Sequence, residues 1–294
     1  IIEQTNNGPH GNIKKIIYAG YATDPLNYEY IDDLIEKSVN FGQVIGIHSK
    51  LIKISDRLIK ILSSDNIAKT SYLTVSVDGG DDKSYNLAHS LTEKVKVYNR
   101  VIDNIKKLND ASVNSKNKLD LSANYLITKV NCSRDEVFKG VDNLINAGVD
   151  SIRFSFPQLP RGTNSYEGTI IPNRQEVKKI YDDIKPVIDS FKDRKTNVVL
   201  IDYDADKSIN EARTLPCFSR FIYPAISYDG YLSNCSQSAA THFKDMALGN
   251  LQNKDFWEAF YDYDEKDIFS FMQNEFKKMI KNDCRCDRKE HTVN

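Results

Sequence analysis

The stretch KKIIYAGYATDPLNYEYIDDLIEKSVNFG, residues 14–42, sets the pattern for the first two thirds of the chain. Its opening KKIIYAGYA predicts a buried strand. After it, Ile31, Leu34, Ile35 and Val39 recur at helical spacing, and Gly42 ends the predicted helix. The stretch therefore predicts a strand followed directly by an amphipathic helix.

The same alternation continues outward from this stretch. Further strands are expected at QVIGIHS (43–49), SYLTVSVDGG (71–80), LDLSANYLITKV (119–130) and SIRFSF (151–156). Helices are expected at 52–62, in a charged stretch that ends near Leu108, at 133–148 and at 176–191. The third of these has Ser133 and Glu136 at capping-box spacing and Gly148 as its terminator. This rhythm predicts an α/β fold with a parallel sheet and ligand chemistry at the carboxyl ends of the strands.

The pattern changes near residue 205. FIYPAISYDGYLSNC (221–235) predicts a β-hairpin that turns at Asp229-Gly230, and ALGNL and two short aromatic-rich helices follow it. We expect two domains, an α/β domain over 1–204 and a smaller α+β domain over 205–294.

Composition excludes several classes of protein. The 294 residues are 40% hydrophobic and 28% charged, which is typical of soluble globular proteins. The net charge of −1 gives no overall attraction to nucleic acid, and no apolar run approaches the ~18 residues of a membrane span. No signal segment opens the chain, so a cytoplasmic protein with no membrane or nucleic-acid partner is expected.

Four of the five cysteines lie in the last third of the chain, at Cys217, Cys235, Cys284 and Cys286. Four thiolates at one point are what a tetrahedral zinc ion or an iron–sulfur cluster requires. The odd cysteine count and the absence of a signal segment favour metal over disulfides. Only Cys284 and Cys286 are close together, and their one-residue gap is short for a zinc knuckle, so the spacing favours iron–sulfur and leaves zinc open.

The cysteine region resembles the auxiliary-cluster domain of radical SAM enzymes, of the SPASM or shorter Twitch type. In that family a cysteine precedes a hairpin with an Asp-Gly turn, a second cysteine follows it, and a Gly-Asn pair, here Gly249-Asn250, begins the next segment. The four cysteines are similar to the Twitch pattern, which implies one auxiliary [4Fe-4S] cluster.

The upstream half resembles the family's partial (β/α)6 barrel. AGYATDPL (19–26) stands where the family has a Gly-Gly-Glu-Pro-like motif that binds the amino group of S-adenosylmethionine, and Thr23 and Asp24 replace its glutamate. SVDGG resembles the strand whose serine and aspartate lie beside the cofactor, ITKVNCSRDEV the strand with its asparagine, and SIRFSF the strand whose end lines the adenine pocket. The cofactor-binding residues implied by the resemblance are Gly20, Thr23, Asp24, Ser76, Asp78, Asn131 and Ser155.

One family feature is missing, because no three cysteines are spaced three and two residues apart. The chain begins at Ile1, so we expect that the first βα unit, with its own [4Fe-4S] cluster, is absent from this sequence and that the chain alone is inactive. For the complete protein the resemblance implies an oxidoreductase or maturase that generates a 5′-deoxyadenosyl radical, acts on a peptide or small metabolite, and takes electrons from a flavodoxin or ferredoxin. Its auxiliary cluster is expected to accept or relay an electron.

Two other hypotheses remain open. The chain could be a noncatalytic α/β binding module whose tail is held by a zinc site of four cysteines. A barrel enzyme that uses ordinary acid–base groups has less support, because no carboxylate pair or Ser/His/Asp set can be placed together. The lone His48 and His89 are expected to be structural.

Overall fold

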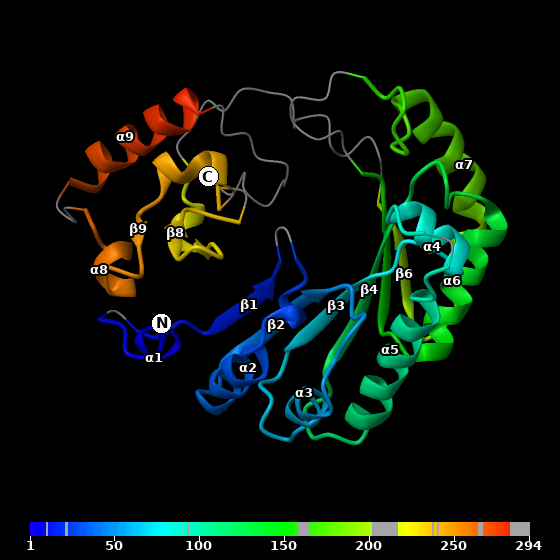
Figure 1. Cartoon of the computed structure of the whole chain (residues 1–294), viewed down its shortest axis with the longest axis horizontal. Coiled ribbons are helices and arrows are strands. Elements are labelled where there is room, and N and C mark those ends of the chain that lie inside the picture. The colour runs from blue at the N-terminus through cyan, green and yellow to red at the C-terminus, as the bar shows by residue number, and fades with distance from the viewer. Residues whose placement is uncertain are drawn as a thin grey trace. The chain divides into compact units, whose positions relative to one another are not determined.

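The computed structural model describes residues 1–9, 11–20, 23–92, 94–157, 165–201, 217–236, 238–239, 241–263 and 267–282. The chain divides into two compact units (Figure 1). Unit 2 spans Lys14–Ala205, and unit 1 combines Ile1–Ile13 with Asp206–Asn294. The division near residue 205 is where the composition changes, while the first 13 residues join the unit that follows it in sequence.

Unit 2 is built on a six-stranded sheet whose strands are all parallel and follow one another in sequence order. The strands are β1 (Lys15–Ala19), β2 (Val44–Ser49), β3 (Tyr72–Ser76), β4 (Asp120–Leu126), β5 (Ser151–Ser155) and β6 (Asn197–Leu200). The predicted α/β class with a parallel sheet is confirmed. β6 was not predicted, because four residues are too few to display an apolar alternation.

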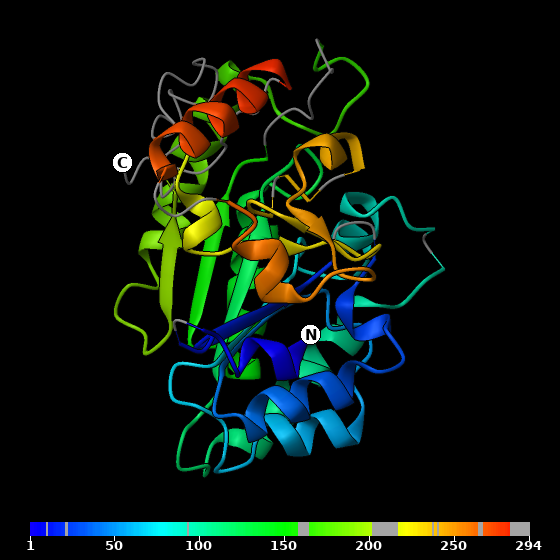
Figure 2. The ribbon, with the colours of Figure 1, turned by 90° about the vertical axis from the view of Figure 1, so that its left-hand side faces the viewer.

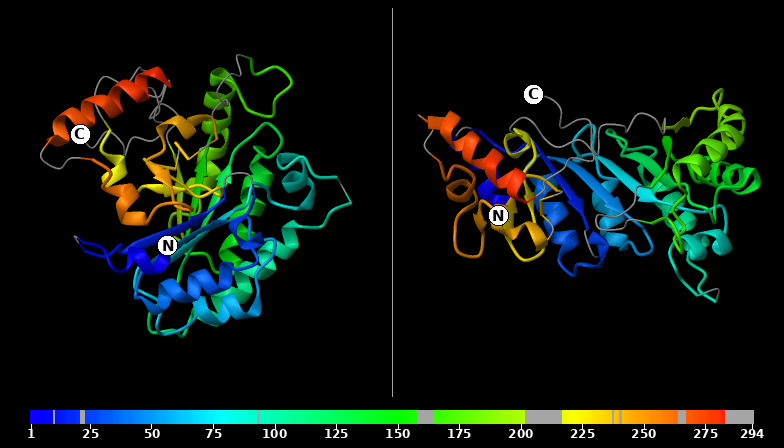
Figure 3. Two further views of the ribbon diagram at one scale, coloured as in Figure 1. Left: turned by 60° about the vertical axis from the view of Figure 1, so that its left-hand side comes forward. Right: turned by 90° about the horizontal axis from the view of Figure 1, so that it is seen from above.

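Helices connect these strands and cover one face of the sheet (Figures 1 and 3). They are η1 (Pro25–Asn27), α2 (Ile31–Asn40), α3 (Asp56–Leu62), α4 (Asp82–Ala88), α5 (Tyr98–Ser112), α6 (Arg134–Ala147) and α7 (Arg174–Asp189). The helix expected at 52–62 begins at Asp56, because the Ser55 hydroxyl accepts a hydrogen bond from Leu58 N and caps it there. The charged stretch that ends near Leu108 contains two helices, α4 and α5, instead of one.

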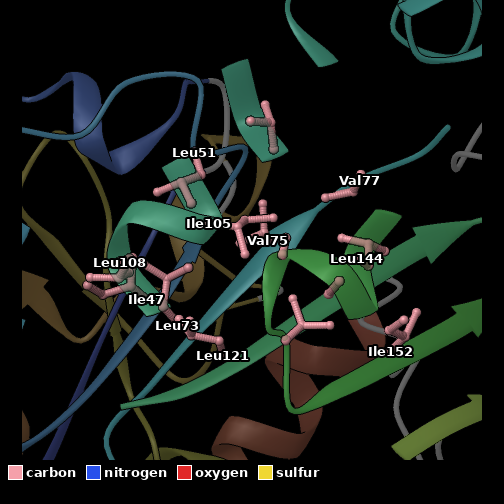
Figure 4. Close-up of a cluster of buried hydrophobic side chains, with 14 of the residues drawn as sticks. Ile47, Leu51, Leu73, Val75, Val77, Ile105, Leu108, Leu121, Leu144 and Ile152 are labelled. Atoms are coloured by element: carbon pink, nitrogen blue, oxygen red, sulfur yellow. The ribbon is translucent and has the colours of Figure 1, made fainter. Parts of the chain in front are cut away.

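The core of unit 2 lies between the sheet and these helices. Alternate strand residues such as Ile47, Leu73, Val75, Leu121 and Ile152 are fully or almost fully buried, and they form one cluster with helical side chains (Figure 4). Because successive strand residues point to opposite faces, the residues between them define a second face of the sheet. We call it the polar face; its members include Gly46, His48, Tyr72, Thr74, Ser76, Ser122, Asn124, Leu126, Ser151, Arg153 and Ser155.

Helix α6 has the ends that its sequence predicts, with one difference. The Ser133 hydroxyl accepts a hydrogen bond from Glu136 N at 3.3 Å, and Gly148 ends the helix in the left-handed conformation with φ of +90°. The capping box is only half formed, because the Glu136 carboxylate accepts a hydrogen bond from Gly80 N, also at 3.3 Å. Glu136 therefore links α6 to the loop that follows β3.

Replacing Gly148 by alanine is expected to destabilise unit 2. A left-handed non-glycine residue costs about 1–2 kcal/mol, and the new Cβ would lie 2.3 Å from Asn109 Nδ2. Gly42→Ala is the matched control, since Gly42 also has positive φ but a Cβ at that position would have no atom within 4 Å. Urea unfolding should show the larger loss for Gly148→Ala; equal losses in the two variants would contradict the proposed clash.

Unit 1 contains a three-stranded antiparallel sheet and short helices (Figure 2). Its elements are α1 (Ile2–Thr5), η3 (Ser219–Phe221), β7 (Ala225–Ile226), β8 (Tyr231–Ser233), η4 (Thr241–Met246), β9 (Gly249–Asn250), α8 (Phe256–Phe260) and α9 (Ile268–Lys281). The predicted hairpin is confirmed as β7 and β8, with Gly230 at φ of +83° in its turn. The Gly249-Asn250 pair forms β9 and pairs with β8.

The first residues of the chain belong to unit 1 through contacts with α8. The Trp257 indole donates a hydrogen bond to Gln4 O at 2.7 Å, and Phe256 N donates one to Gln4 Oε1 at 3.3 Å. Among the helices that the structure describes, none has the length and apolar character needed to cross a membrane.

Candidate functional site

The loop after β1 makes a tight turn that requires glycine at its start. A Cβ on Gly20 would lie 1.6 Å from Thr23 O, so the backbone of residue 23 folds directly onto Gly20. Asp24 fixes the far side of this turn. Its carboxylate accepts hydrogen bonds from Leu26 N at 3.0 Å, Ser49 Oγ at 2.9 Å and Lys50 N at 2.5 Å, which ties the ends of β1 and β2 together.

A second buried network joins the ends of β3 and β4. Asn131 is fully buried; its amide donates to Asp78 O and Leu126 O, both at 2.9 Å, and its Oδ1 accepts from Thr128 N at 2.7 Å. The Asp78 carboxylate accepts from Leu126 N at 2.7 Å, and the Tyr125 hydroxyl donates to Asn131 O at 2.8 Å. These two predicted site residues thus hold the backbone of the strand ends in place.

Ser76 and Ser155 differ from Asp78 and Asn131. Both lie on the polar face and are partly exposed, and their hydroxyls have no hydrogen-bond partner in the described part of the chain. Ser76 is in register with Asn124, and Ser155 with Leu126 on the same strand, β4. Their hydroxyls are available to a ligand at the carboxyl ends of the strands.

Arg153 adds an exposed positive charge to the polar face, next to Asn124 in the strand register. No carboxylate of the described residues lies within ion-pair distance of its guanidinium. Arg153 was not predicted as a site residue, although the alternation of buried and polar residues in SIRFSF predicts that it points away from the core. This arrangement can bind an anionic group beside the free serine hydroxyls.

Tyr85 and His89 were also not predicted as site residues. His89 Nε2 lies 3.2 Å from Asp78 Oδ2, at ion-pair distance but without hydrogen-bond alignment, and the two rings of Tyr85 and His89 are 4.3 Å apart. The Tyr85 hydroxyl is fully buried without a hydrogen-bond partner among the described residues. Burial raises the pKa of Tyr85, and the charges of Asp78 and Asp24 raise it further, so its hydroxyl stays protonated. The four-residue spacing of Tyr85 and His89 on one helical turn was the available sequence signal.

In unit 1, Cys217 and Cys235 are buried free thiols that flank the hairpin, each 7% exposed. The Ser219 hydroxyl lies 3.0 Å from Cys217 Sγ, and the Ser238 hydroxyl lies 3.7 Å from Cys235 Sγ. Each thiol therefore has a serine hydroxyl as a polar neighbour.

The buried side chains around Cys217 include a residue of α9. Cys217 forms a hydrophobic cluster with Phe243, Met246 and Met279, and Met279 lies in the last turn of α9. The end of α9 is thereby packed near Cys217.

The predicted ligands Cys284 and Cys286 lie outside the described residues. Within the described part, no three Cys, His, Asp or Glu side chains gather in a way that could hold a metal ion. Cys132 lies in unit 2, where its thiol is 3.7 Å from Lys129 O and burial raises its pKa, which is the behaviour of a structural cysteine.

This chain is similar in structure to several solved proteins. No family model matches the chain, and no curated protein sequence matches it. Streptococcus suis SuiB bound to S-adenosylmethionine is similar over 92% of this chain and 59% of its own, with 17% identity and a TM-score of 0.59. SuiB bound to its precursor peptide SuiA is similar over 84% of this chain and 54% of its own, with 18% identity and a TM-score of 0.53.

A second solved protein covers still more of the chain. Native anSMEcpe with bound AdoMet and the Kp18Cys peptide is similar over 97% of this chain and 80% of its own, with 14% identity and a TM-score of 0.57. The chain spans less than two thirds of the length of SuiB. Together with the sequential parallel sheet of unit 2, these similarities establish that the chain has the fold of the radical SAM enzymes.

Proposed function

We propose that this chain is part of a radical SAM enzyme and binds S-adenosylmethionine at the carboxyl ends of β1–β5. The main support is the position of the free hydroxyls of Ser76 and Ser155, which lie at strand ends in a fold whose solved examples include proteins bound to this cofactor. When bound, S-adenosylmethionine and its cluster would supply the radical chemistry for hydrogen-atom abstraction from the substrate. The residues of this chain then have to bind and orient the cofactor and the substrate, and to exclude water from the site.

The described residues suit such a cofactor, and they have different roles in its binding. Gly20 lets Thr23 O lie directly against its Cα, and Asp24 holds this segment against β2. Asp78 and Asn131 keep the β3 and β4 ends rigid, so that Ser76 presents its hydroxyl at a fixed position. We infer that Thr23, exposed in the same turn as Asp24, contributes a polar contact to the cofactor.

We further propose that Cys217, Cys235, Cys284 and Cys286 bind an auxiliary [4Fe-4S] cluster. The fit of unit 1 rests on the two buried, unlinked thiols beside hydroxyl groups, and on α9, whose last turn packs against Cys217. In the sequence, Cys284 follows Asn282, the last described residue, by two positions. Four cysteine ligands leave no open coordination position, and such a cluster accepts or relays an electron.

A peptide or small metabolite with an anionic group is the substrate class that the polar face favours. Arg153 and Asn124 can bind a carboxylate, and SuiB and anSMEcpe have been solved with peptides. An auxiliary cluster that accepts electrons favours a net oxidation of the substrate. A flavodoxin or ferredoxin remains the proposed electron donor.

The proposed function is tested by isothermal titration of the anaerobically reconstituted full-length gene product with S-adenosylmethionine. Gly20→Ala is expected to weaken the affinity at least ~10-fold, because its Cβ cannot coexist with Thr23 O and about 1.4 kcal/mol of lost binding corresponds to tenfold. Relieving this clash requires Thr23 and Asp24 to move, so the unfolding midpoint of unit 2 is measured in the same variant to separate lost binding from lost folding. Wild-type protein that binds no S-adenosylmethionine would contradict the function, and unchanged affinity in Gly20→Ala would contradict the role of the turn.

A further inference from the structure

Asn234 occupies a junction between the segments of unit 1 that lead to cysteines. It directly precedes Cys235, and its backbone carbonyl accepts a hydrogen bond of 3.5 Å from the Ser219 hydroxyl, which lies 3.0 Å from Cys217 Sγ. Its side-chain amide donates to Glu275 Oε2 at 3.1 Å. Asn234 is therefore hydrogen-bonded to Ser219 beside Cys217, is covalently joined to Cys235, and is hydrogen-bonded to the helix α9.

Glu275 connects this junction to the tail of the chain. It lies in the middle of α9, one turn before Met279, which packs against Cys217, and α9 ends three residues before Cys284. The hydrogen bond from Asn234 thus fixes the position of the helix from which Cys284 and Cys286 continue.

The Asn234–Glu275 contact is buried, which makes its partners hard to replace. Asn234 is 2% and Glu275 is 3% exposed, and Glu275 Oε1 is paired with Lys278 Nζ at 2.8 Å. Glu275 also attracts the buried Arg220 guanidinium, which donates to Phe260 O at 2.6 Å and lies 4.6 Å from the Phe271 ring. A buried carboxylate is tolerated only with such partners, so loss of the Asn234 donor changes the position of α9 or leaves an acceptor unsatisfied.

We infer that Asn234 and Glu275 are positioning residues for the cysteine site. Their hydrogen bond holds α9, whose last turn packs against Cys217, next to the hairpin strand that leads to Cys235. This inference rests on the proposed auxiliary cluster. It assigns the two residues no contact with iron, and their effect on the cluster is indirect.

The test compares Asn234→Asp with the double variant Asn234→Asp/Glu275→Gln. The single variant places two carboxylates against each other, whereas the double variant restores a hydrogen bond of reversed polarity, in which the introduced glutamine amide donates to the introduced aspartate carboxylate. Each reconstituted protein is challenged anaerobically at pH 8 with a ferrous-iron chelator, and retained iron and the electron paramagnetic resonance spectrum of the reduced protein are recorded. Far-UV circular dichroism of the same samples reports on folding.

Asn234→Asp is expected to retain iron about 10–100-fold less tightly, the usual effect of losing a group that orients a metal ligand, and the double variant should regain wild-type retention and spectrum. Wild-type retention in Asn234→Asp, or no recovery in the double variant, would overturn the inference. If Asn234→Asp does not fold, Glu275→Gln, which still accepts from Asn234, is compared with Glu275→Leu, which cannot; equal retention in these two would also overturn it. A wild-type protein that holds no auxiliary iron contradicts the proposed function itself, and that result is distinct from the others.

Discussion

Replacing Cys217 or Cys235 by alanine is expected to remove the auxiliary cluster and to unfold much of unit 1. Both thiols are buried, and each would supply one of four ligands to the cluster. In small metal-binding domains the free energy of metal binding is part of the free energy of folding, and structural zinc in finger peptides contributes about 10–16 kcal/mol on this scale. Iron and sulfide content, together with the thermal unfolding of unit 1 followed by its tryptophan, measure both effects.

Cys132→Ala is the matched control for these variants. Cys132 is the fifth cysteine, lies in unit 2 and contacts Lys129 O, so its removal should leave the iron content of the auxiliary site unchanged. Full iron content and a wild-type unfolding curve in Cys217→Ala or Cys235→Ala would contradict their role as ligands. A loss of iron from Cys132→Ala as large as from those two variants would contradict it as well.

Asn131→Ala is expected to destabilise unit 2 by about 3 kcal/mol or more, since each buried group that loses its hydrogen-bond partner costs about 1–3 kcal/mol. The substitution leaves Asp78 O and Leu126 O without the amide donor and Thr128 N without its acceptor. The ends of β3 and β4 should separate, and the affinity for S-adenosylmethionine should fall with them.

Asn124→Ala supplies the comparison for Asn131→Ala. Asn124 lies on the polar face of β4 and has no side-chain hydrogen bond among the described residues, so its removal should change stability by no more than about 0.5 kcal/mol. Urea denaturation of both variants gives the two values directly. Similar small losses in both would refute the structural role of Asn131.

Local sequence patterns predicted most of the elements of this fold. Strands β1–β5 of unit 2 and the hairpin of unit 1 are visible in the sequence because strand alternation, helical spacing and the Asp-Gly turn act over a few residues. Strand β6 and the separation of α4 from α5 were missed. β6 is too short to show a period, and α4 is defined by the side chain of Asp81, which accepts a hydrogen bond from Ser84 N.

Less of the candidate site could be predicted from the sequence. The resemblance located Gly20, Asp78 and Asn131 at strand ends, but the contact between Asp78 and Asn131 joins residues 53 positions apart. Local patterns carry no information on such pairs. The same reason explains why the link between Asn234 and Glu275, 41 positions apart, could be found only in the folded chain.

One iron–sulfur cluster is proposed to link the hairpin and the tail of unit 1. A crystal structure of the anaerobically reconstituted protein, with anomalous data collected on both sides of the iron absorption edge, tests it most directly. We predict a single compact iron signal bonded to the sulfur atoms of Cys217, Cys235, Cys284 and Cys286. Sulfur atoms too far apart to share one cluster, or a single zinc ion bound by these cysteines, would contradict the proposed iron–sulfur site.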